Sequence, residues 1–97
     1  PEEVEEVMRS HPLVDEVAVF GVFDPKWGET VAAVIKPRNI SLDVEKLKEY
    51  LKERLARYKV PKYIWIVNEI PRTSVGKIDY VGLKEKYSRV LASCEEK

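Results

Sequence analysis

Residues 71–77, with the sequence PRTSVGK, place a lysine directly after a glycine in a polar run between two apolar segments. A Gly-Lys pair can bind phosphate, because glycine lets main-chain amides approach an anion and lysine adds a positive charge. The P-loop version of this motif needs a glycine five positions before the second glycine and a Ser or Thr after the lysine. This chain has Pro71 and Ile78 at those positions, so a P-loop is excluded.

The local sequence favours a simpler interpretation. Thr73, Ser74 and Gly76 are typical turn residues. Lys77 would then be a solvated lysine, as most lysines are. Whether the lysine does chemistry depends on the elements around the turn.

The first half of the chain predicts a helix followed by two strands. Apolar residues at helical spacing, behind Pro1 in a first turn, predict a short amphipathic helix that stops at His11 and Pro12. Residues 16–23 and 30–35 are apolar on both alternating faces and flank the turn-rich sequence DPKWGE. We expect two strands joined by a tight loop, with both sheet faces covered by helices or by another domain.

The clearest predicted helix carries apolar residues at helical spacing, namely Val44, Leu47, Leu51 and Leu55. Ser41 or Asp43 is its expected N-cap. Arg57 and Lys59 are expected at its C-terminal end, and Pro61 is expected to stop it.

The run YIWIV at residues 63–67 predicts a third strand, buried on both faces. The strand-helix-strand order predicts a right-handed crossover between parallel neighbours. A last helix is expected around Leu83 and Tyr87, although Gly82 near its start weakens that helix by about 1 kcal/mol. The prediction is an α+β fold in the order α-β-β-α-β-α, with a small mixed sheet of about three main strands plus short ones, flanked by three helices.

The composition excludes several classes of function. A chain of 97 residues makes one domain, and 17 Lys plus Arg balance 17 Asp plus Glu, so no global charge favours nucleic acid or an anionic membrane. No apolar run approaches the roughly 18 residues of a membrane span. A single Cys94 cannot form an internal disulfide, and we expect a cytoplasmic protein without a metal site. Because the chain lacks an initiator Met and begins inside a predicted helix, we expect it to derive from a longer polypeptide.

Five short blocks follow one another along residues 1–89: PEEVE, His11-Pro12, GVFDPKWGE, ARYKVPK and PRTSVGKI. Together they resemble, at near-standard intervals, the small C-terminal domain of the acyl- and aryl-CoA synthetases. This superfamily also includes carrier-loading adenylation domains and firefly luciferase. Each block alone is a weak signal, and their order carries the resemblance.

The resemblance implies a two-step reaction. A carboxylic acid attacks the α-phosphate of ATP to give an acyl-adenylate, and a thiol, usually that of coenzyme A, then displaces AMP. In relatives a large N-terminal domain holds ATP, Mg²⁺ and the acid, and the small domain closes over it in two orientations as a mobile lid. Lys77 matches the lysine that serves adenylation, and side chains of Thr73 and Ser74, with Gly76, would support its loop.

The loop DPKWGE has two interpretations. The favoured one is a strand connection in which Gly28 supplies a positive φ and Trp27 packs on the sheet edge. The other, implied by the resemblance, is that Asp24, Trp27, Gly28 and Glu29 form an inter-domain or CoA-side loop.

Two further features have ordinary explanations. Residues 46–62 hold seven Lys or Arg against two Glu, which is typical of the solvated face of an amphipathic helix, with contact to coenzyme A phosphates as the alternative. Tyr58 and Pro61 are expected to fix the position at which the chain leaves this helix and enters the third strand. His11 has no partner at metal-ligand spacing and is interpreted as a surface residue that ends a helix.

Two departures from the family pattern limit these expectations. The glycine-rich segment and hinge residue that precede this domain in relatives are not in this sequence, nor is anything expected to bind ATP. The 97 residues alone are therefore predicted to bind no cofactor and to catalyse nothing. After Lys77 relatives usually carry a basic residue where this chain has Asp79 and Tyr80, so the last helix is expected to start later or to pack differently.

The expected partners are the N-terminal adenylating domain of the same protein, a carboxylic acid, and the thiol of coenzyme A or of a carrier protein. Self-association through the exposed domain face is also expected. The alternative function is a free-standing α/β interaction module, in which Lys77 would be only a solvated turn residue.

Overall fold

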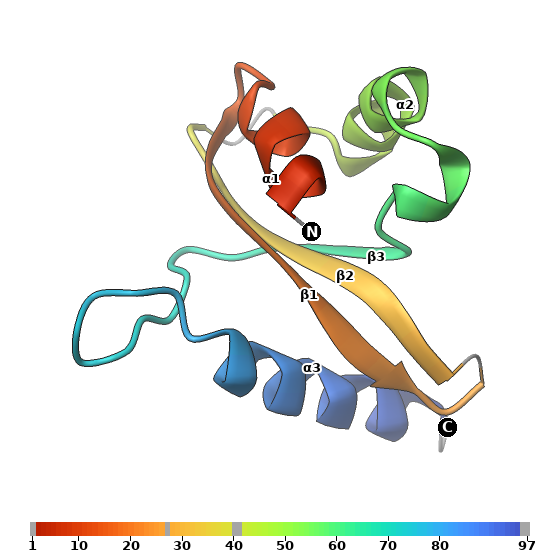
Figure 1. The fold of residues 1–97 in the computed structure, drawn as a ribbon, viewed down its shortest axis with the longest axis vertical. Helices are drawn as coiled ribbons and strands as arrows, with labels where there is room; N and C mark the ends of the chain where they lie inside the picture. The colour runs from red at the N-terminus through yellow and green to blue at the C-terminus, as the bar shows by residue number, and fades with distance from the viewer. Residues whose placement is uncertain (1, 27, 40–41, 96–97) are drawn as a thin grey trace.

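A three-stranded sheet runs through the middle of the molecule, with helices on both faces (Figure 1). The computed structural model describes residues 2–26, 28–39 and 42–95. Its elements are α1 (Glu2–Arg9), β1 (Val14–Asp24), β2 (Gly28–Pro37), α2 (Val44–Arg54), the 3-10 turn η1 (Arg57–Lys59), β3 (Tyr63–Ile66) and α3 (Tyr80–Glu95). The predicted α+β class and element order are confirmed. The expectations for Pro1, Trp27 and Ser41 fall outside the described residues.

The sheet is mixed, in the order β1-β2-β3. β1 and β2 form a long antiparallel hairpin whose register runs from Val14 opposite Pro37 to Asp24 opposite Gly28. β2 and β3 are parallel neighbours, as the strand-helix-strand order predicted. Both strands of the hairpin are longer than predicted. At the turn they continue to Asp24 and from Gly28, because the residues typical of turns begin only at Asp24.

Two hydrophobic cores lie on opposite faces of this sheet. Because side chains alternate along a strand, Val17 and Val19 join a core with α1 and α2, whereas Ala18 and Phe20 join a core with α3. Figure 1 shows the same arrangement, with α3 alone on one side. Of the two expected covers for the sheet faces, helices or another domain, the structure shows helices on both faces. No helix among the described residues is long and apolar enough to cross a membrane.

The expectation that the third strand is buried on both faces is wrong. β3 is at the edge of the described sheet, and α1 and α3 pack mainly on β1 rather than over this edge. Trp65 stacks on Tyr87 of α3 with ring centroids 4.3 Å apart, yet Trp65 remains partly exposed and Ile66 is 48% exposed. An apolar run of strand length cannot distinguish a central strand from an edge strand that packs only in part.

The boundaries of α2 differ from the prediction at one end. Asp43 is the N-cap, and its carboxylate accepts a hydrogen bond from the Glu45 amide at 2.9 Å. The helix ends at Arg54, well before Pro61, because Leu55 turns to an extended conformation and its side chain is buried in the core. Arg57 and Lys59 therefore lie in the separate turn η1 and not at the end of the helix.

The helix α3 starts at Tyr80, not later as expected. Asp79 explains this start, because its carboxylate accepts a hydrogen bond from the Gly82 amide at 3.0 Å and its carbonyl accepts one from Leu83. A Cβ at Gly82 would lie only 2.5 Å from the Asp79 carboxylate. The glycine that seemed to weaken the helix is the residue that leaves room for its N-cap.

Candidate functional site

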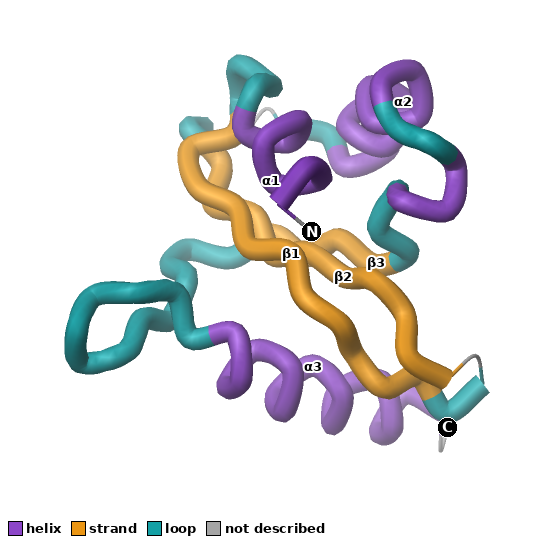
Figure 2. The backbone as a smooth tube through the Cα atoms, viewed as in Figure 1, coloured by secondary structure: helices purple, strands orange, loops and turns teal. Residues whose placement is uncertain are grey.

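Residues 71–79 form a narrow hairpin that projects beyond the sheet, seen as the long loop at the left of Figure 2. Arg72 and Ile78 pair as an antiparallel bridge, and the Thr73 amide donates to the Lys77 carbonyl at 2.7 Å. The Gly76 amide donates to the Thr73 carbonyl at 2.9 Å, and Gly76 has a φ of 87°. This is the pattern of a three-residue hairpin loop whose last position requires a left-handed conformation. The turn predicted from Gly76 is confirmed.

Lys77 follows this left-handed glycine, and its side chain is exposed. Within the part of the chain that the structure describes, the Lys77 ammonium makes no hydrogen bond or ion pair. The neighbouring Val75 is 77% exposed. The hairpin thus presents an unpaired cation next to an apolar side chain, which suits contact with an anion held elsewhere.

Among the described residues, Thr73 and Ser74 make no side-chain hydrogen bond, so their expected support of this loop stays a prediction. The support comes from Arg72, which the sequence analysis did not single out. Its Nη1 donates to the Gly76 carbonyl at 3.1 Å, and its Nη2 forms an ion pair with Glu16 on β1. The long side chain of Arg72 spans both contacts.

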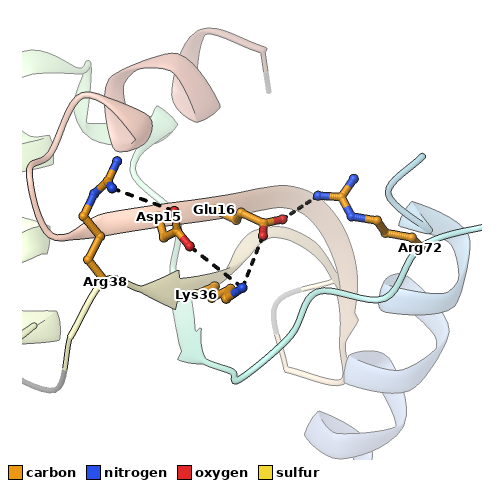
Figure 3. A network of polar contacts seen from close by, with 5 residues as sticks. All are labelled: Asp15, Glu16, Lys36, Arg38 and Arg72. Atoms are coloured by element: carbon orange, nitrogen blue, oxygen red, sulfur yellow. Dashed lines mark hydrogen bonds and ion pairs between the residues drawn. The ribbon is translucent and has the colours of Figure 1, made fainter. Parts of the chain in front are cut away.

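Arg72 joins the hairpin to a charged network on β1 and β2, drawn in Figure 3. Glu16 also lies 3.6 Å from the Lys36 ammonium, which is 3.8 Å from Asp15, and Asp15 is 3.9 Å from Arg38. The hydrogen bond from Arg72 lowers the pKa of Glu16 below its ordinary value of 4.5, and the charges of Arg72 and Lys36 act in the same direction, while burial opposes them. Because the folded state lowers this pKa, the stability contributed by the Glu16 carboxylate is present above pH 4.5 and is lost as the pH falls through the folded pKa.

The DPKWGE loop supports the interpretation as a strand connection. Asp24 is buried, and its carboxylate accepts hydrogen bonds from the Lys26 amide at 2.8 Å and from the Tyr63 hydroxyl at 2.5 Å. Gly28 has the expected positive φ, at 80°. Glu29 forms an ion pair with Lys84 of α3 at 2.8 Å. The carboxylates of Asp24 and Glu29 thus make contacts within the domain, whereas Trp27 is outside the described residues.

The structure does not bring the two loops together. Figure 1 shows the β1–β2 turn and the hairpin at residues 71–79 at opposite ends of the molecule. The two sets of predicted site residues therefore lie on different parts of this domain.

The basic segment at residues 46–62 makes ordinary surface contacts. Arg54 lies over the Tyr50 ring at 3.7 Å, and Lys59 forms an ion pair with Glu3 at 2.5 Å. Pro61 is buried, as expected of a residue that fixes the path into β3. Tyr58 is 81% exposed, so its expected part in fixing that path is not supported by packing.

His11 is a structural residue at the end of α1. Its Nδ1 accepts a hydrogen bond from the Leu13 amide at 3.1 Å, and its ring packs edge-on against Tyr50 with centroids 4.8 Å apart. Across the described ranges, no group of three or more His, Cys, Asp or Glu could hold a metal ion.

A buried glutamate links α1 to the residues that follow the hairpin. Glu5 accepts hydrogen bonds at 2.8 Å from the Val19 amide on β1 and at 2.8 Å from the Tyr80 hydroxyl, and it pairs with Arg9 at 3.4 Å. Burial raises the pKa of Tyr80 to about 12, and the hydrogen bond and charge of Glu5 add to this shift. The signal in the sequence was a glutamate three positions before Met8, on the apolar face of the helix.

Glu5→Ala is expected to destabilise the fold by about 2 kcal/mol, because it leaves the Val19 amide and the Tyr80 hydroxyl without their acceptor. Tyr80→Phe should cost about 1 kcal/mol, since Glu5 keeps its other partners. Urea unfolding of the purified chain measures both. Glu6→Ala, at an exposed position on the same helix, is the matched control and should change little. Equal effects of Glu5→Ala and Glu6→Ala would contradict the assigned role.

Comparison with known proteins places this geometry in a family. Residues 3–77 match the AMP-binding enzyme C-terminal domain. The long-chain-fatty-acid–CoA ligase FadD13 of Mycobacterium tuberculosis is 43% identical over 91 residues, which are 94% of this chain and 18% of that protein. The putative acyl-CoA synthetase YngI of Bacillus subtilis is 42% identical over 87 residues, 89% of this chain and 16% of that protein.

Solved structures agree with these sequence matches. The Mycobacterium tuberculosis fatty acyl CoA synthetase superposes with a TM-score of 0.85 at 42% identity, covering 93% of this chain and 18% of that one. ATP-bound MatB from Rhodopseudomonas palustris gives a TM-score of 0.86 at 32% identity, covering 94% and 18%. The chain spans less than a fifth of the length of these relatives. The resemblance drawn from the five sequence blocks is confirmed: the chain belongs to the family of AMP-binding enzyme C-terminal domains.

Proposed function

We propose that this chain is the mobile C-terminal lid of an acid–CoA ligase and that Lys77 is its catalytic residue for ATP-dependent adenylation of a carboxylic acid. The observation that carries the proposal is the position of Lys77. The family match runs through residues 3–77 and so reaches this lysine, which stands unpaired within the described structure on an exposed hairpin. Relatives are named as ligases of fatty acids with CoA, which supports the same reaction class for the larger enzyme.

The chemistry needs a cation at one point. A carboxylate oxygen attacks the α-phosphorus of ATP, the bond from that phosphorus to the β-phosphate oxygen breaks, and pyrophosphate leaves. Two anions must approach each other, and negative charge stays on the oxygens in the transition state. The Lys77 ammonium would donate hydrogen bonds to the acid carboxylate and to an α-phosphate oxygen, which lowers the repulsion between them.

Lysine on a glycine turn suits a site assembled from two domains. Its ammonium is a compact charge on a long flexible stem, whereas the planar fork of arginine tolerates fewer approach directions. Gly76 has no Cβ, so the hairpin tip stays narrow enough to enter a crowded cleft. In the second step a thiol displaces AMP from the acyl-adenylate, and the lid turns so that Lys77 is no longer at the phosphate.

The substrates bind elsewhere in this proposal. Lys77 lies on an exposed hairpin and not in a cavity, so ATP, the acid and Mg²⁺ are assigned to the larger N-terminal domain of the same protein. That Mg²⁺, when bound there, would neutralise phosphate charge. Coenzyme A, or the thiol of a carrier protein, would enter for the second step. The 97 residues alone are proposed to be inactive.

A domain exchange tests this function. In FadD13, the segment that matches this chain is replaced by residues 1–97, and exchange of pyrophosphate into ATP is measured with a long-chain fatty acid. We expect exchange well above that of FadD13 truncated before the same segment. The isolated chain should show none. A folded fusion no more active than the truncated ligase, or exchange by the isolated chain, would contradict the proposal.

A further inference from the structure

The backbone hydrogen bonds of the hairpin that carries Lys77 lie within the hairpin itself. The bridge between Arg72 and Ile78 and the bond from the Thr73 amide to the Lys77 carbonyl close it, but they do not join it to the sheet, and residues 71–77 are all exposed. Gly76, directly before the lysine, is the residue type with the least restricted backbone. A hairpin of this kind would sample several directions unless another group fixed it.

Arg72 makes the side-chain contacts that fix the direction of the hairpin. The Gly76 carbonyl and the Lys77 amide belong to one planar peptide unit, so a hydrogen bond to that carbonyl fixes the plane from which the Lys77 side chain departs. Nη1 of Arg72 makes this bond at 3.1 Å. Nη2 of the same guanidinium pairs with Glu16 on β1, which itself lies 3.6 Å from the Lys36 ammonium (Figure 3).

We propose that Arg72 is a positioning residue for adenylation: its guanidinium, anchored on Glu16, orients the peptide unit before Lys77 and thereby aims the ammonium. This inference rests on the proposed function of Lys77. Arginine is required because one planar group must serve a carbonyl and a carboxylate together, which the single ammonium of lysine does less well. Misplacing a catalytic group by about 1 Å costs on the order of 100-fold in rate.

The kinetic test uses the fusion of residues 1–97 with the N-terminal part of FadD13. Arg72→Ala should lower kcat for pyrophosphate exchange by about 10- to 100-fold and leave KM for ATP and acid unchanged, because both bind the other domain. Thioester formation from prepared acyl-adenylate should be retained. Arg72→Lys should recover part of the loss. Arg38→Ala removes an arginine from the same charged network without touching the hairpin, and should have no effect.

The decisive comparison is made in the Lys77→Ala background. If Arg72 acts through Lys77, Arg72→Ala should slow this variant no further. A merely structural residue would lower both backgrounds by the same factor, and that result would overturn the inference. Retained exchange in Arg72→Ala, with exchange lost in Lys77→Ala, would overturn the inference alone. Full exchange in Lys77→Ala would overturn the proposed function as well.

A readout on the chain itself is independent of activity. The pKa of the Glu16 carboxyl is followed by NMR in the 97-residue chain, with circular dichroism to confirm folding. Arg72→Ala should raise this pKa toward 4.5, since the hydrogen bond from Arg72 is the main cause of its lowering, while Arg38→Ala should not. If Arg72→Ala does not fold, Glu16→Gln in the fusion should still lower kcat in the same direction. An unchanged Glu16 pKa, or unchanged exchange by Glu16→Gln, would overturn the inference.

Discussion

Lys77→Ala lowers acid-dependent pyrophosphate exchange by about 100- to 1000-fold, which is the result expected for removal of a preorganised positive group from a reaction between two anions. The reason lies in the charge distribution. In the proposed reaction the ammonium acts where the carboxylate and the α-phosphate meet, and Arg72 is the only other positively charged side chain of the hairpin. Arg72 cannot replace it, because its guanidinium is engaged by Gly76 and Glu16. The measurement is kcat for exchange in the fusion enzyme.

The same variant provides its own control. Thioester formation from prepared acyl-adenylate does not need a cation between carboxylate and phosphate, so Lys77→Ala should leave this second step within about twofold of the unchanged enzyme. Lys86→Ala, at an exposed lysine on α3, should leave both steps unchanged. Equal loss of both steps in Lys77→Ala would show a general defect and contradict the assignment.

Gly76→Val is the second change with a large expected effect, a loss of exchange of about 10- to 100-fold. Gly76 has a φ of 87°, where a left-handed conformation costs a residue with a Cβ roughly 1–2 kcal/mol, and a β-branched residue fits worst. Apart from Gly76 itself and its two chain neighbours, no atom of the described structure lies within 4 Å of a Cβ built at Gly76, so the cost is conformational and does not come from a clash with the rest of the domain. The hairpin should open and move Lys77, while the cores stay intact.

A series of substitutions at Gly76 tests whether the backbone conformation of this residue causes the loss of exchange. Asparagine tolerates the left-handed region better than other non-glycine residues, so Gly76→Asn should retain most of the exchange activity, and Gly76→Ala should fall between Asn and Val. The thermal midpoint should change little across the series, because the hairpin is exposed. If Gly76→Val lowered the midpoint strongly, or kept full exchange activity, the account of the turn would be wrong.

The element order could be predicted from sequence because it depends on local periodicity. The apolar spacing of Leu47 and Leu51 and the alternation in β1 are visible within short windows. The burial of β3 could not be predicted in the same way, since edge position depends on which strand pairs where. Asp79 shows a different limit of prediction from sequence. Because Asp79 departs from the family pattern, it was expected to disturb the start of α3, although aspartate before a helix is a common N-cap.

The turn at Gly76 could be predicted from the sequence, but the contacts that anchor it to the sheet could not. Gly76 and Lys77 are recognisable from type and spacing, as is the positive φ of Gly28. The Arg72–Glu16 ion pair joins residues that are 56 positions apart, and no local sequence pattern predicts such a pair. The same holds for Asp24, whose carboxylate meets a tyrosine hydroxyl 39 positions away. Long-range polar contacts become visible only when the sheet brings their strands together.

Several apolar side chains remain on the surface and are candidates for the contact with a larger domain. Phe23, Ile66, Val75 and Val81 are 61%, 48%, 77% and 71% exposed. Val75 lies on the same hairpin as Lys77, where a lid would meet its partner. Self-association of the isolated chain through such residues stays a prediction, to be measured by analytical ultracentrifugation.

The most direct measurement of the central claim is a crystal structure of the fusion enzyme with ATP and a non-reactive analogue of the fatty acid. The account predicts the hairpin inside the cleft of the larger domain, with the Lys77 ammonium at about 3 Å from both an α-phosphate oxygen and an oxygen of the acid. The Arg72 contacts with Gly76 and Glu16 should be retained. Lys77 in solvent, with the lid closed and both substrates bound for adenylation, would contradict the account.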